Sequence, residues 1–422
     1  MTGTRPTYPL FAKMQSFVKT DLSYFIRGGF WINSNYVFGS ILSLVLSMLF
    51  AHYVSKDIFG IYKYIISIAS VAAAFSLTGM NVAVMRSVAQ GFDGIFKKSL
   101  IVQFKWSLPQ LLFVLAFSAY YFFQGNSTYG FAFLFISVLS PLSSIANTYN
   151  ALLNGKKDFK TGSLYGFFTN VAYFIVMTIA ILSASSSALI LAVSYFLVMT
   201  SMNVFFCIRI YKKYEAGKKQ DYREEDISYG KHMSLMGAVG SLASQLDNIL
   251  LYHLLGPATL ALYSFATIIP ERIRSMFGFI STLAFPKIAE KEESISRKAL
   301  AHKILQLLGL SIVIAGVYAL TAPFLYDLLF PQYSNAVIYS QIFALSLVAI
   351  GANISSTALQ AQRRQKELYY LNTIAPILKI VLTVVGIWYF GIWGAIISKL
   401  LSYFFLLGFS SYLLLKNDSP RI

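Results

Sequence analysis

Cysteine and histidine are scarce in the 422-residue sequence, which contains a single cysteine, Cys207, and four histidines. One cysteine excludes a disulfide framework and every metal site that needs several cysteine ligands. Charged residues are also rare, at 12% of the chain compared with about 25% in an average soluble domain. These absences exclude a disulfide-rich secreted domain and a soluble domain of ordinary composition.

Sequence signatures of common catalytic sites are missing as well. The segment "NGKKD" at 154–158 lacks the GxxxxGK[ST] spacing that holds the phosphates of ATP. Neither HExxH nor GxSxG occurs, and no loop carries a pair of candidate catalytic carboxylates. We therefore expect no enzymatic activity, no metal and no organic cofactor. Whether a proton or a sodium gradient drives the protein stays open.

Long apolar runs are what the sequence has instead. Hydrophobic residues make up 57% of the chain, and the mean hydropathy is +0.63. Most runs reach the roughly 20 residues that a helix needs to cross the hydrocarbon core of a bilayer. They predict an all-α integral membrane protein with twelve transmembrane helices. The expected spans are residues 30–53, 60–85, 100–123, 128–151, 163–183, 187–209, 232–254, 258–285, 304–327, 337–360, 368–389 and 391–415.

Basic residues indicate the orientation of these spans. If the N-terminus is cytoplasmic, only one of the 34 Lys and Arg residues, Lys56, falls in an outside loop. Loops rich in Lys and Arg stay on the cytoplasmic side of a membrane, so this bias places both termini in the cytoplasm. It also accounts for the net charge of +17 without nucleic acid as a partner.

A charged stretch after the sixth span divides the chain into halves. We predict a cytoplasmic amphipathic segment over 1–29, an N-lobe over 30–209, a cytoplasmic linker over 210–231, a C-lobe over 232–415 and a cytoplasmic tail over 416–422. An offset of 201 residues aligns "FAHYVSKDIFGIYKYI" with "LYHLLGPATLALYSFA", which indicates a weak repeat. Because each lobe has an even number of spans, six, both lobes enter the membrane in the same orientation. Their pseudo-twofold axis should therefore follow the membrane normal and pass through a central site.

Charged residues inside the spans are the candidates for that site. The stretch "ATIIPERIRSM" places Glu271, Arg272 and Arg274 in an apolar run. A charge at the bilayer centre costs about 2.5–3.5 kcal/mol on insertion scales, so such residues face protein or a water-filled cavity. Pro270 should break the helix beside them, because proline has no amide hydrogen to donate.

Two lysines, Lys379 and Lys399, lie deep in the last two spans. We interpret them, together with Arg272 and Arg274, as the cationic, substrate-binding wall of the central cavity, the alternative being buried ion pairs. The two arginines lie about 200° apart around a helix. One of them can therefore pair with an acid while the other, Arg272, binds the ligand.

Two acids fall in the same region, Asp247 in span seven and Glu271 in span eight. Each is either a site that couples transport to a proton or cation, or a structural partner of a nearby Arg or Lys. Four deep bases against these two acids leave a surplus of positive charge. A cavity with that charge suits an anionic ligand.

Four sequence features together resemble a known family. They are the hairpin "LFAHYVSKDIFGIYKYI" with its F-G-x-Y, its degenerate copy "LGPATLALYSFA", the "QLDNIL" of span seven and the "NGKKDF" turn. Set in twelve spans, they are similar to polysaccharide flippases of the multidrug/oligosaccharidyl-lipid/polysaccharide (MOP) exporter superfamily. The resemblance covers residues 25 to 415, and its nearest branch is the O-antigen and capsule repeat-unit flippases.

The resemblance implies a V-shaped pair of six-helix bundles that opens alternately to either side of a bacterial inner membrane. It implies a flippase that moves undecaprenyl-pyrophosphate-linked oligosaccharide repeat units to the outer leaflet for cell-surface polysaccharide biosynthesis. Membrane lipids and other polysaccharide-assembly proteins are further implied partners. Family members have cationic residues in the cavity, and Arg272, Arg274, Lys379 and Lys399 match that property. Ala261 departs from the pattern, because it replaces the hairpin glycine in the second copy.

Two other functions fit parts of the pattern. A cation-coupled multidrug exporter of the same superfamily would need an acidic cavity, which the surplus of bases disfavours. A membrane polysaccharide polymerase or ligase would need a large outer loop with catalytic residues. The expected outer loops are short, for example "QGNS" at 124–127.

Overall fold

Every regular element in the described part of the chain is a helix. The structure is a computed structural model that describes residues 22–215, 221–276, 297–350, 355–356, 358–359 and 364–416. The predicted all-α fold is confirmed for these residues. Parts of the predicted terminal segments, and residues 277–285 of the eighth expected span, lie outside them.

The helices follow one another with short connections. In the first half they are α2 (Leu22–Tyr53), α3 (Lys56–Ala72), η1 (Ala73–Ser76), α4 (Met80–Ala89), α5 (Ile95–Trp106), α6 (Leu108–Phe123), α7 (Ser127–Ala146), α8 (Tyr149–Gly155), α9 (Phe159–Ala184) and α10 (Ala188–Glu215). In the second half they are α11 (Glu224–Leu255), α12 (Pro257–Met276), α14 (Arg297–Leu329), η2 (Pro331–Ala336), α15 (Val337–Phe343), η3 (Ala344–Ile350) and α17 (Gln365–Lys416).

Nine helices of the described residues are long and apolar enough to cross a membrane. The protein is therefore a multi-pass membrane protein. One of the nine, α17, turns back on itself at Gly391, whose φ of 56° is outside the helical range. Ser398 beyond the turn donates a hydrogen bond of 2.6 Å to the carbonyl oxygen of Leu382 before it, so the two arms of α17 lie side by side. The total of twelve spans stays a prediction.

The second expected span is not one continuous helix. The chain leaves the helical path at Leu77, whose φ is 56°, and resumes it in α4. The amide of Gly79 donates a hydrogen bond of 3.0 Å to Ser234 Oγ on α11, so a contact with the second half supports the break. The predicted linker over 210–231 is also partly helical, because α10 extends to Glu215 and α11 begins at Glu224.

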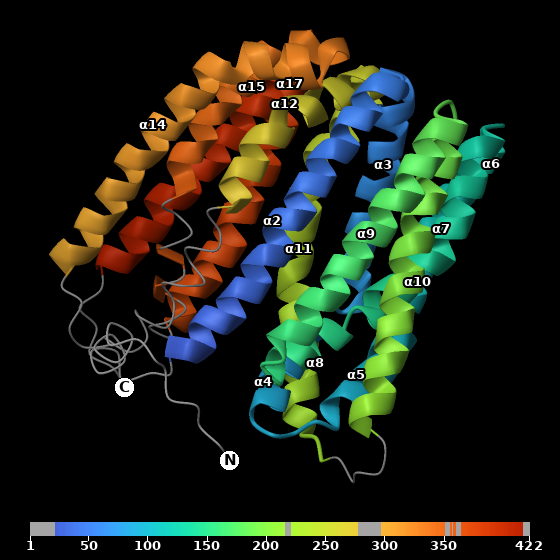
Figure 1. Cartoon of the computed structure of the whole chain (residues 1–422), viewed down its shortest axis with the longest axis vertical. Coiled ribbons are helices and arrows are strands. Elements are labelled where there is room, and N and C mark those ends of the chain that lie inside the picture. The colour runs from blue at the N-terminus through green and yellow to red at the C-terminus, as the bar shows by residue number, and fades with distance from the viewer. Residues whose placement is uncertain are drawn as a thin grey trace.

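The helices form two groups that converge at one end of the molecule (Figure 1). Helices α3 and α5 to α10 lie on one side, and α12, α14, α15 and α17 lie on the other. Helices α2 and α11 run between them: α2 packs against α9, and α11 packs against α3, α4 and α17. The groups diverge towards the end that holds α4, α5 and α8, which is consistent with the expected two-lobed arrangement.

Buried aromatic side chains join the two groups where they converge. Phe59 of α3 packs against Phe265 of α12 with ring centroids 4.9 Å apart, and Phe265 stacks on Tyr333 of η2 at 3.8 Å. Tyr64 of α3 stacks on Tyr252 of α11 at 3.9 Å. Aromatic pairs contribute about 0.5–1.5 kcal/mol beyond the area that they bury, so this cluster holds the converging end closed.

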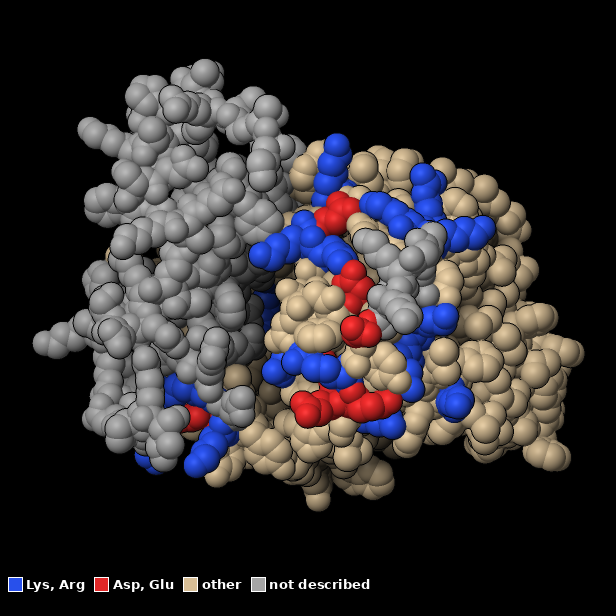
Figure 2. All heavy atoms as spheres, turned by 90° about the horizontal axis from the view of Figure 1, so that it is seen from below, with Lys and Arg blue, Asp and Glu red and all other residues tan. Residues whose placement is uncertain are grey.

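The diverging end carries most of the described charged residues, and we call it the basic end. Viewed towards that end, Lys and Arg side chains are grouped on the face with Asp and Glu among them (Figure 2). Several form ion pairs there, including Lys98 with Glu224 at 3.4 Å and Arg364 with Glu367 at 3.0 Å. A surface with this bias is the one that the orientation prediction assigns to the cytoplasm.

Candidate functional site

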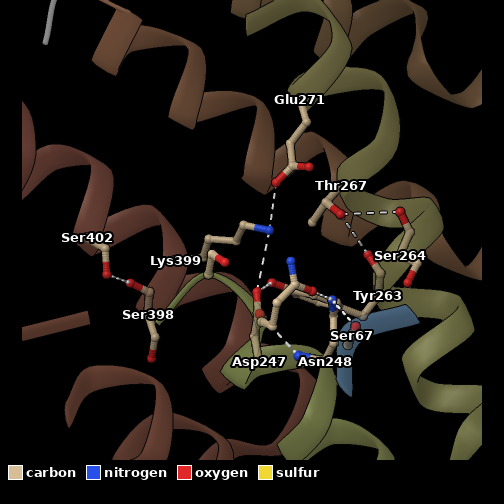
Figure 3. Close-up of polar contacts among 12 residues, drawn as sticks. Ser67, Asp247, Asn248, Tyr263, Ser264, Thr267, Glu271, Ser398, Lys399 and Ser402 are labelled. Carbon is tan, nitrogen blue, oxygen red and sulfur yellow. Dashed lines mark hydrogen bonds and ion pairs between the residues drawn. The ribbon is translucent and has the colours of Figure 1, made fainter. Parts of the chain in front are cut away.

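Lys399 on the second arm of α17 lies between the two acids singled out by the sequence (Figure 3). Its Nζ is 2.6 Å from Glu271 Oε1 on α12 and 3.5 Å from Asp247 Oδ2 on α11. The Asp247 side chain is 2% exposed and that of Lys399 is 12% exposed, whereas that of Glu271 is 41% exposed. These charged side chains are tolerated inside the protein because each of them lies beside an opposite charge.

Hydrogen bonds fix the position of Asp247. The Tyr263 hydroxyl donates a hydrogen bond to Asp247 Oδ2, and the backbone N–H of Asn248 donates one to Asp247 Oδ1 at 3.1 Å. The Asn248 side chain in turn donates a 3.0 Å hydrogen bond to Ser67 Oγ on α3 (Figure 3). The carboxylate is therefore connected to α12, α17 and, through Asn248, to the N-lobe.

Arg272 is the exposed cation of the group. Its guanidinium donates a hydrogen bond to Ser43 Oγ on α2, and it lines a cavity of about 400 Å³ between α2, α9, α10 and α12. Ser43 lies ten residues before the end of α2, about 15 Å along the helix axis. Because the hydrocarbon core is about 30 Å thick, a span that ends with α2 at Tyr53 would put this cavity near the middle of the membrane.

Arg274, unlike Arg272, contacts a helix of its own half of the chain. Its guanidinium lies over the ring of Tyr403 on α17, with the carbon Cζ 3.3 Å from the ring centroid. The two arginines therefore have different surroundings, as their spacing on a helix predicts. The expected ion pair between an arginine and Asp247 or Glu271 is replaced, among the described residues, by the ion pairs of Lys399.

Lys379, on the first arm of α17, is half-buried and interacts electrostatically with Asp247. Pro270 is buried within α12, which stays helical from Pro257 to Met276. The predicted break at Pro270 is therefore wrong. One missing hydrogen bond does not end a helix whose sides are packed against α3 and α15.

Lys63 of α3 belongs to the same group but was not expected there. It is half-buried and interacts electrostatically with Glu271, Arg272 and Lys399. The hydroxyl of Ser55 caps the N-terminus of α3 by accepting a 3.4 Å hydrogen bond from Ile58, so the helix starts at Lys56. Lys63 consequently lies about 10 Å inside the helix rather than close to its end.

The group as described contains five bases and two acids. The bases are Lys63, Arg272, Arg274, Lys379 and Lys399, and the acids are Asp247 and Glu271. Lys399 is largely neutralised by its two ion pairs, whereas Arg272 faces the cavity. Neither an Asp nor a Glu is among the described residues that line this cavity. The electrostatics suit an anion that approaches from the cavity.

A second polar cavity adjoins the first. Its volume is about 420 Å³, and it shares Asn35, Asn170, Tyr195 and Met199 with the cavity at Arg272. Its other lining residues come from the N-lobe helices α7 to α10 and the turn before α8. They are Ser143, Ser144, Asn147, Tyr149, Asn150, Gly166, Thr169, Phe196 and Asn203.

A sequence model of a family described as polysaccharide biosynthesis protein matches residues 25–292. The chain belongs to this family. The match includes the N-lobe, the linker and the helices that carry Asp247 and Arg272, so the resemblance seen in the sequence is confirmed. No curated protein sequence matches the chain.

Solved transporters of the MOP superfamily share the fold. The lipid II flippase MurJ in an inward-closed conformation has a TM-score of 0.64 at 15% identity, covering 90% of this chain and 86% of MurJ. A multidrug resistance MATE transporter in an outward-facing conformation has a TM-score of 0.65 at 13% identity, with coverages of 93% and 97%. A MOP transporter from Pyrococcus furiosus, described by the reverse polarity of its binding pocket, has a TM-score of 0.63 at 12% identity, with coverages of 93% and 96%. These likenesses establish the transporter fold.

Proposed function

We propose that the protein is a flippase for lipid-linked saccharides. It translocates undecaprenyl-pyrophosphate-linked oligosaccharide repeat units from the cytoplasmic to the outer leaflet of a bacterial inner membrane, by alternating access, for cell-surface polysaccharide biosynthesis. Arg272 in a cavity near mid-membrane depth is the observation that carries the proposal. A guanidinium with free donors suits a diphosphate, because its planar fork matches phosphate oxygens.

The surroundings of Arg272 support this ligand. Lys63, Arg274 and Lys379 belong to the same group of charges and add positive charge around Arg272, while the acids are paired with Lys399. A diphosphate cannot cross hydrocarbon unaided, whereas its polyprenyl tail can stay in lipid. A cationic cavity between two groups of helices serves the head of such a molecule and leaves the tail outside.

The remaining parts of the proposal concern orientation and energy. The basic end faces the cytoplasm, with both termini on that side, and membrane lipids and other polysaccharide-assembly proteins are the partners. The Asp247–Lys399–Glu271 triad is where coupling to a proton or sodium ion would act. A carboxylate that binds a cation would release Lys399, and the freed ammonium would then be available to the diphosphate.

The cation-coupled multidrug exporter is the second candidate, since MATE transporters share the fold. A cavity for cationic drugs needs carboxylates, and the described lining of both cavities contains none. A polymerase or ligase finds even less support, because the described turns at the converging end are too short to hold an active site: α2 is joined to α3, and α11 to α12, by one or two residues.

The test measures translocation in vesicles. Purified protein is reconstituted with lipid-linked saccharides extracted from the source membranes. A soluble pyrophosphatase added outside then cleaves only the lipid diphosphates of the outer leaflet. Wild-type protein should make the inner-leaflet pool accessible, and Arg272→Ala should slow that step at least tenfold. Lys97→Ala, at an exposed position of the basic end, is the matched control. Equal rates for wild-type and protein-free vesicles would refute the function.

A further inference from the structure

Asparagine side chains are concentrated in the second polar cavity, which adjoins the cavity at Arg272. Five asparagines line it, contributed by α2, the turn before α8, α8 itself, α9 and α10: Asn35, Asn147, Asn150, Asn170 and Asn203. Ser143, Ser144 and Thr169 add three hydroxyl groups. A polar group buried in a membrane protein without a partner costs free energy, so a polar wall gathered from several helices indicates a polar occupant.

The asparagines are held in pairs. Asn170 donates to Asn35 Oδ1 at 3.3 Å, and Asn150 donates to Asn147 Oδ1 at 2.7 Å. Asn203 donates to Ser143 Oγ at 3.0 Å. Each amide has two hydrogens and a carbonyl oxygen with two lone pairs. Among the described residues these bonds use only part of that capacity, so donors and acceptors remain for a ligand.

The backbone is shaped to admit the Asn35–Asn170 pair. A Cβ added at Gly166 would lie 2.4 Å from Asn35 Nδ2, and a Cβ added at Gly39 would lie 2.7 Å from Asn170 Nδ2. A glycine on each of α2 and α9 therefore makes room for the amide that the other helix projects. The pair is thus positioned by the packing of α2 on α9.

The chemistry of this wall selects an uncharged, hydroxyl-rich ligand. Its described lining residues include neither a base nor an acid, so it offers no opposite charge to a phosphate or to a cationic drug. Amides and hydroxyls both donate and accept hydrogen bonds, as sugar hydroxyls do. Tyr195, which is half-buried, adds an aromatic ring for the apolar side of a sugar. A volume of about 420 Å³ is within the usual range for a small-molecule site.

The two cavities adjoin each other, as the diphosphate and the first sugar of a lipid-linked saccharide do. The asparagine-lined cavity joins the cavity at Arg272 through Asn35, Asn170 and Tyr195, so a ligand can occupy both. In a lipid-linked saccharide the first sugar is bonded directly to the diphosphate. We infer that the asparagine-lined cavity of the N-lobe binds the saccharide of the substrate while Arg272 binds its diphosphate. This inference rests on the proposed flippase function and adds a saccharide subsite to it.

The test compares probes with and without a sugar. The probes are farnesyl diphosphate and farnesyl diphosphate carrying glucose, galactose or N-acetylglucosamine, and the measurement is calorimetric binding to the full-length protein in detergent. At least one sugar-bearing probe should bind wild-type protein about tenfold more tightly than farnesyl diphosphate. Asn150→Ala and Asn203→Ala, which line only the asparagine-lined cavity, should each remove most of that difference and leave the affinity for farnesyl diphosphate unchanged. Asn335→Ala, at an exposed position, should retain the difference.

The outcomes separate the inference from the function. If no probe binds, or if Arg272→Ala leaves all affinities unchanged, the diphosphate site and the flippase function fail. If farnesyl diphosphate binds but none of the sugars adds affinity, or if the difference survives in both asparagine variants, the saccharide subsite fails and the function stands. Variants count only if their melting temperature equals that of the wild type. Asn203→Ala alters a different helix from Asn150→Ala, so a folding defect in one leaves the other informative.

Discussion

Gly60 of α3 packs directly on the backbone of Pro257 at the start of α12. A Cβ added at Gly60 would lie 2.0 Å from the carbonyl oxygen of Pro257, closer than any real Cβ contact. These residues belong to the two copies of the weak sequence repeat, "DIFGIY" and "GPATLALY". The glycine of the first copy therefore allows the N-lobe to approach the second half where the two groups converge.

Gly60→Ala should destabilise the protein, because a backbone atom cannot move aside as a flexible side chain can. Overpacking of this kind costs about 1–3 kcal/mol. The measurement is thermal unfolding of the purified protein in detergent. Gly408→Ala on α17 is the control, since an added Cβ there meets nothing within 4 Å. If Gly60→Ala melts at the temperature of Gly408→Ala, the close approach is not a feature of the resting protein.

Lys399→Met should be strongly destabilising, because it leaves the buried carboxylate of Asp247 without its ion pair. Breaking a buried pair from one side costs about 3–5 kcal/mol, whereas replacing both charges is often close to neutral. The double variant Lys399→Met with Asp247→Asn should therefore recover most of the lost stability. Glu271 needs no matching change, since its side chain is 41% exposed and can be hydrated. A double variant that is no more stable than Lys399→Met would contradict this account.

The sequence was sufficient to predict the helical membrane fold and to identify the charged residues that need a partner or water within the membrane. Hydrophobic runs determine the spans, and the cost of a bare charge in lipid singles out Arg272 and Lys399. The pairing of Lys399 with Asp247 was not predictable. It depends on which faces of α11 and α17 meet, and these residues are more than a hundred positions apart in the chain.

Two further parts of the site escaped prediction for local reasons. Lys63 is three residues inside the predicted span 60–85 and hence close to its end, whereas the Ser55 cap places the start of the helix at Lys56. The asparagines do not stand out in the sequence, because single amides hardly change the hydropathy of a span. Only the packing of α2, α9 and α10 brings Asn35, Asn170 and Asn203 to one cavity. All five lie in predicted spans, so the uncharged amides within the spans point to this cavity.

Lys63→Gln should weaken the binding of farnesyl diphosphate about three- to tenfold. The change removes one positive charge near Arg272 and keeps a side chain of similar length, and the loss corresponds to about 0.7–1.4 kcal/mol. Calorimetric titration in detergent measures it. Lys105→Gln, an exposed position on α5, is the matched control and should bind as the wild type does. Equal losses in both variants would mean that net charge alone, and not position, determines affinity.

Asp158→Ala should destabilise the protein by about 1 kcal/mol, because Asp158 caps the N-terminus of α9. Its Oδ1 accepts a 3.2 Å hydrogen bond from the Thr161 amide, and its Oδ2 lies 3.5 Å from Lys213 Nζ. Burial raises the pKa of Asp158, but the hydrogen bonds from Thr161 and the charge of Lys213 outweigh it, and the pKa lies below its ordinary value.

The pH dependence of this effect follows from the lowered pKa of Asp158. A carboxyl with a lowered pKa in the folded state contributes stability above its unfolded pKa of about 3.9, and the contribution is lost as the pH falls through the folded value. Asp158→Asn keeps a capping oxygen but not the charge. It should be less stable than the wild type at pH 7, and the difference should shrink towards pH 3 in thermal unfolding. A difference that stays constant over this range would exclude the charge as its cause.

Arg272→Cys should react with a water-soluble thiol reagent, because the side chain at 272 is exposed to the cavity between α2 and α12. The experiment uses a protein in which Cys207, which is buried, is replaced by serine, so that the new thiol is the sole target. Tyr263→Cys, at a fully buried position on the same helix, should stay unlabelled. Complete protection at 272 without ligand would place Arg272 in a dry helix interface, and the cavity could then not be the route of a charged head group.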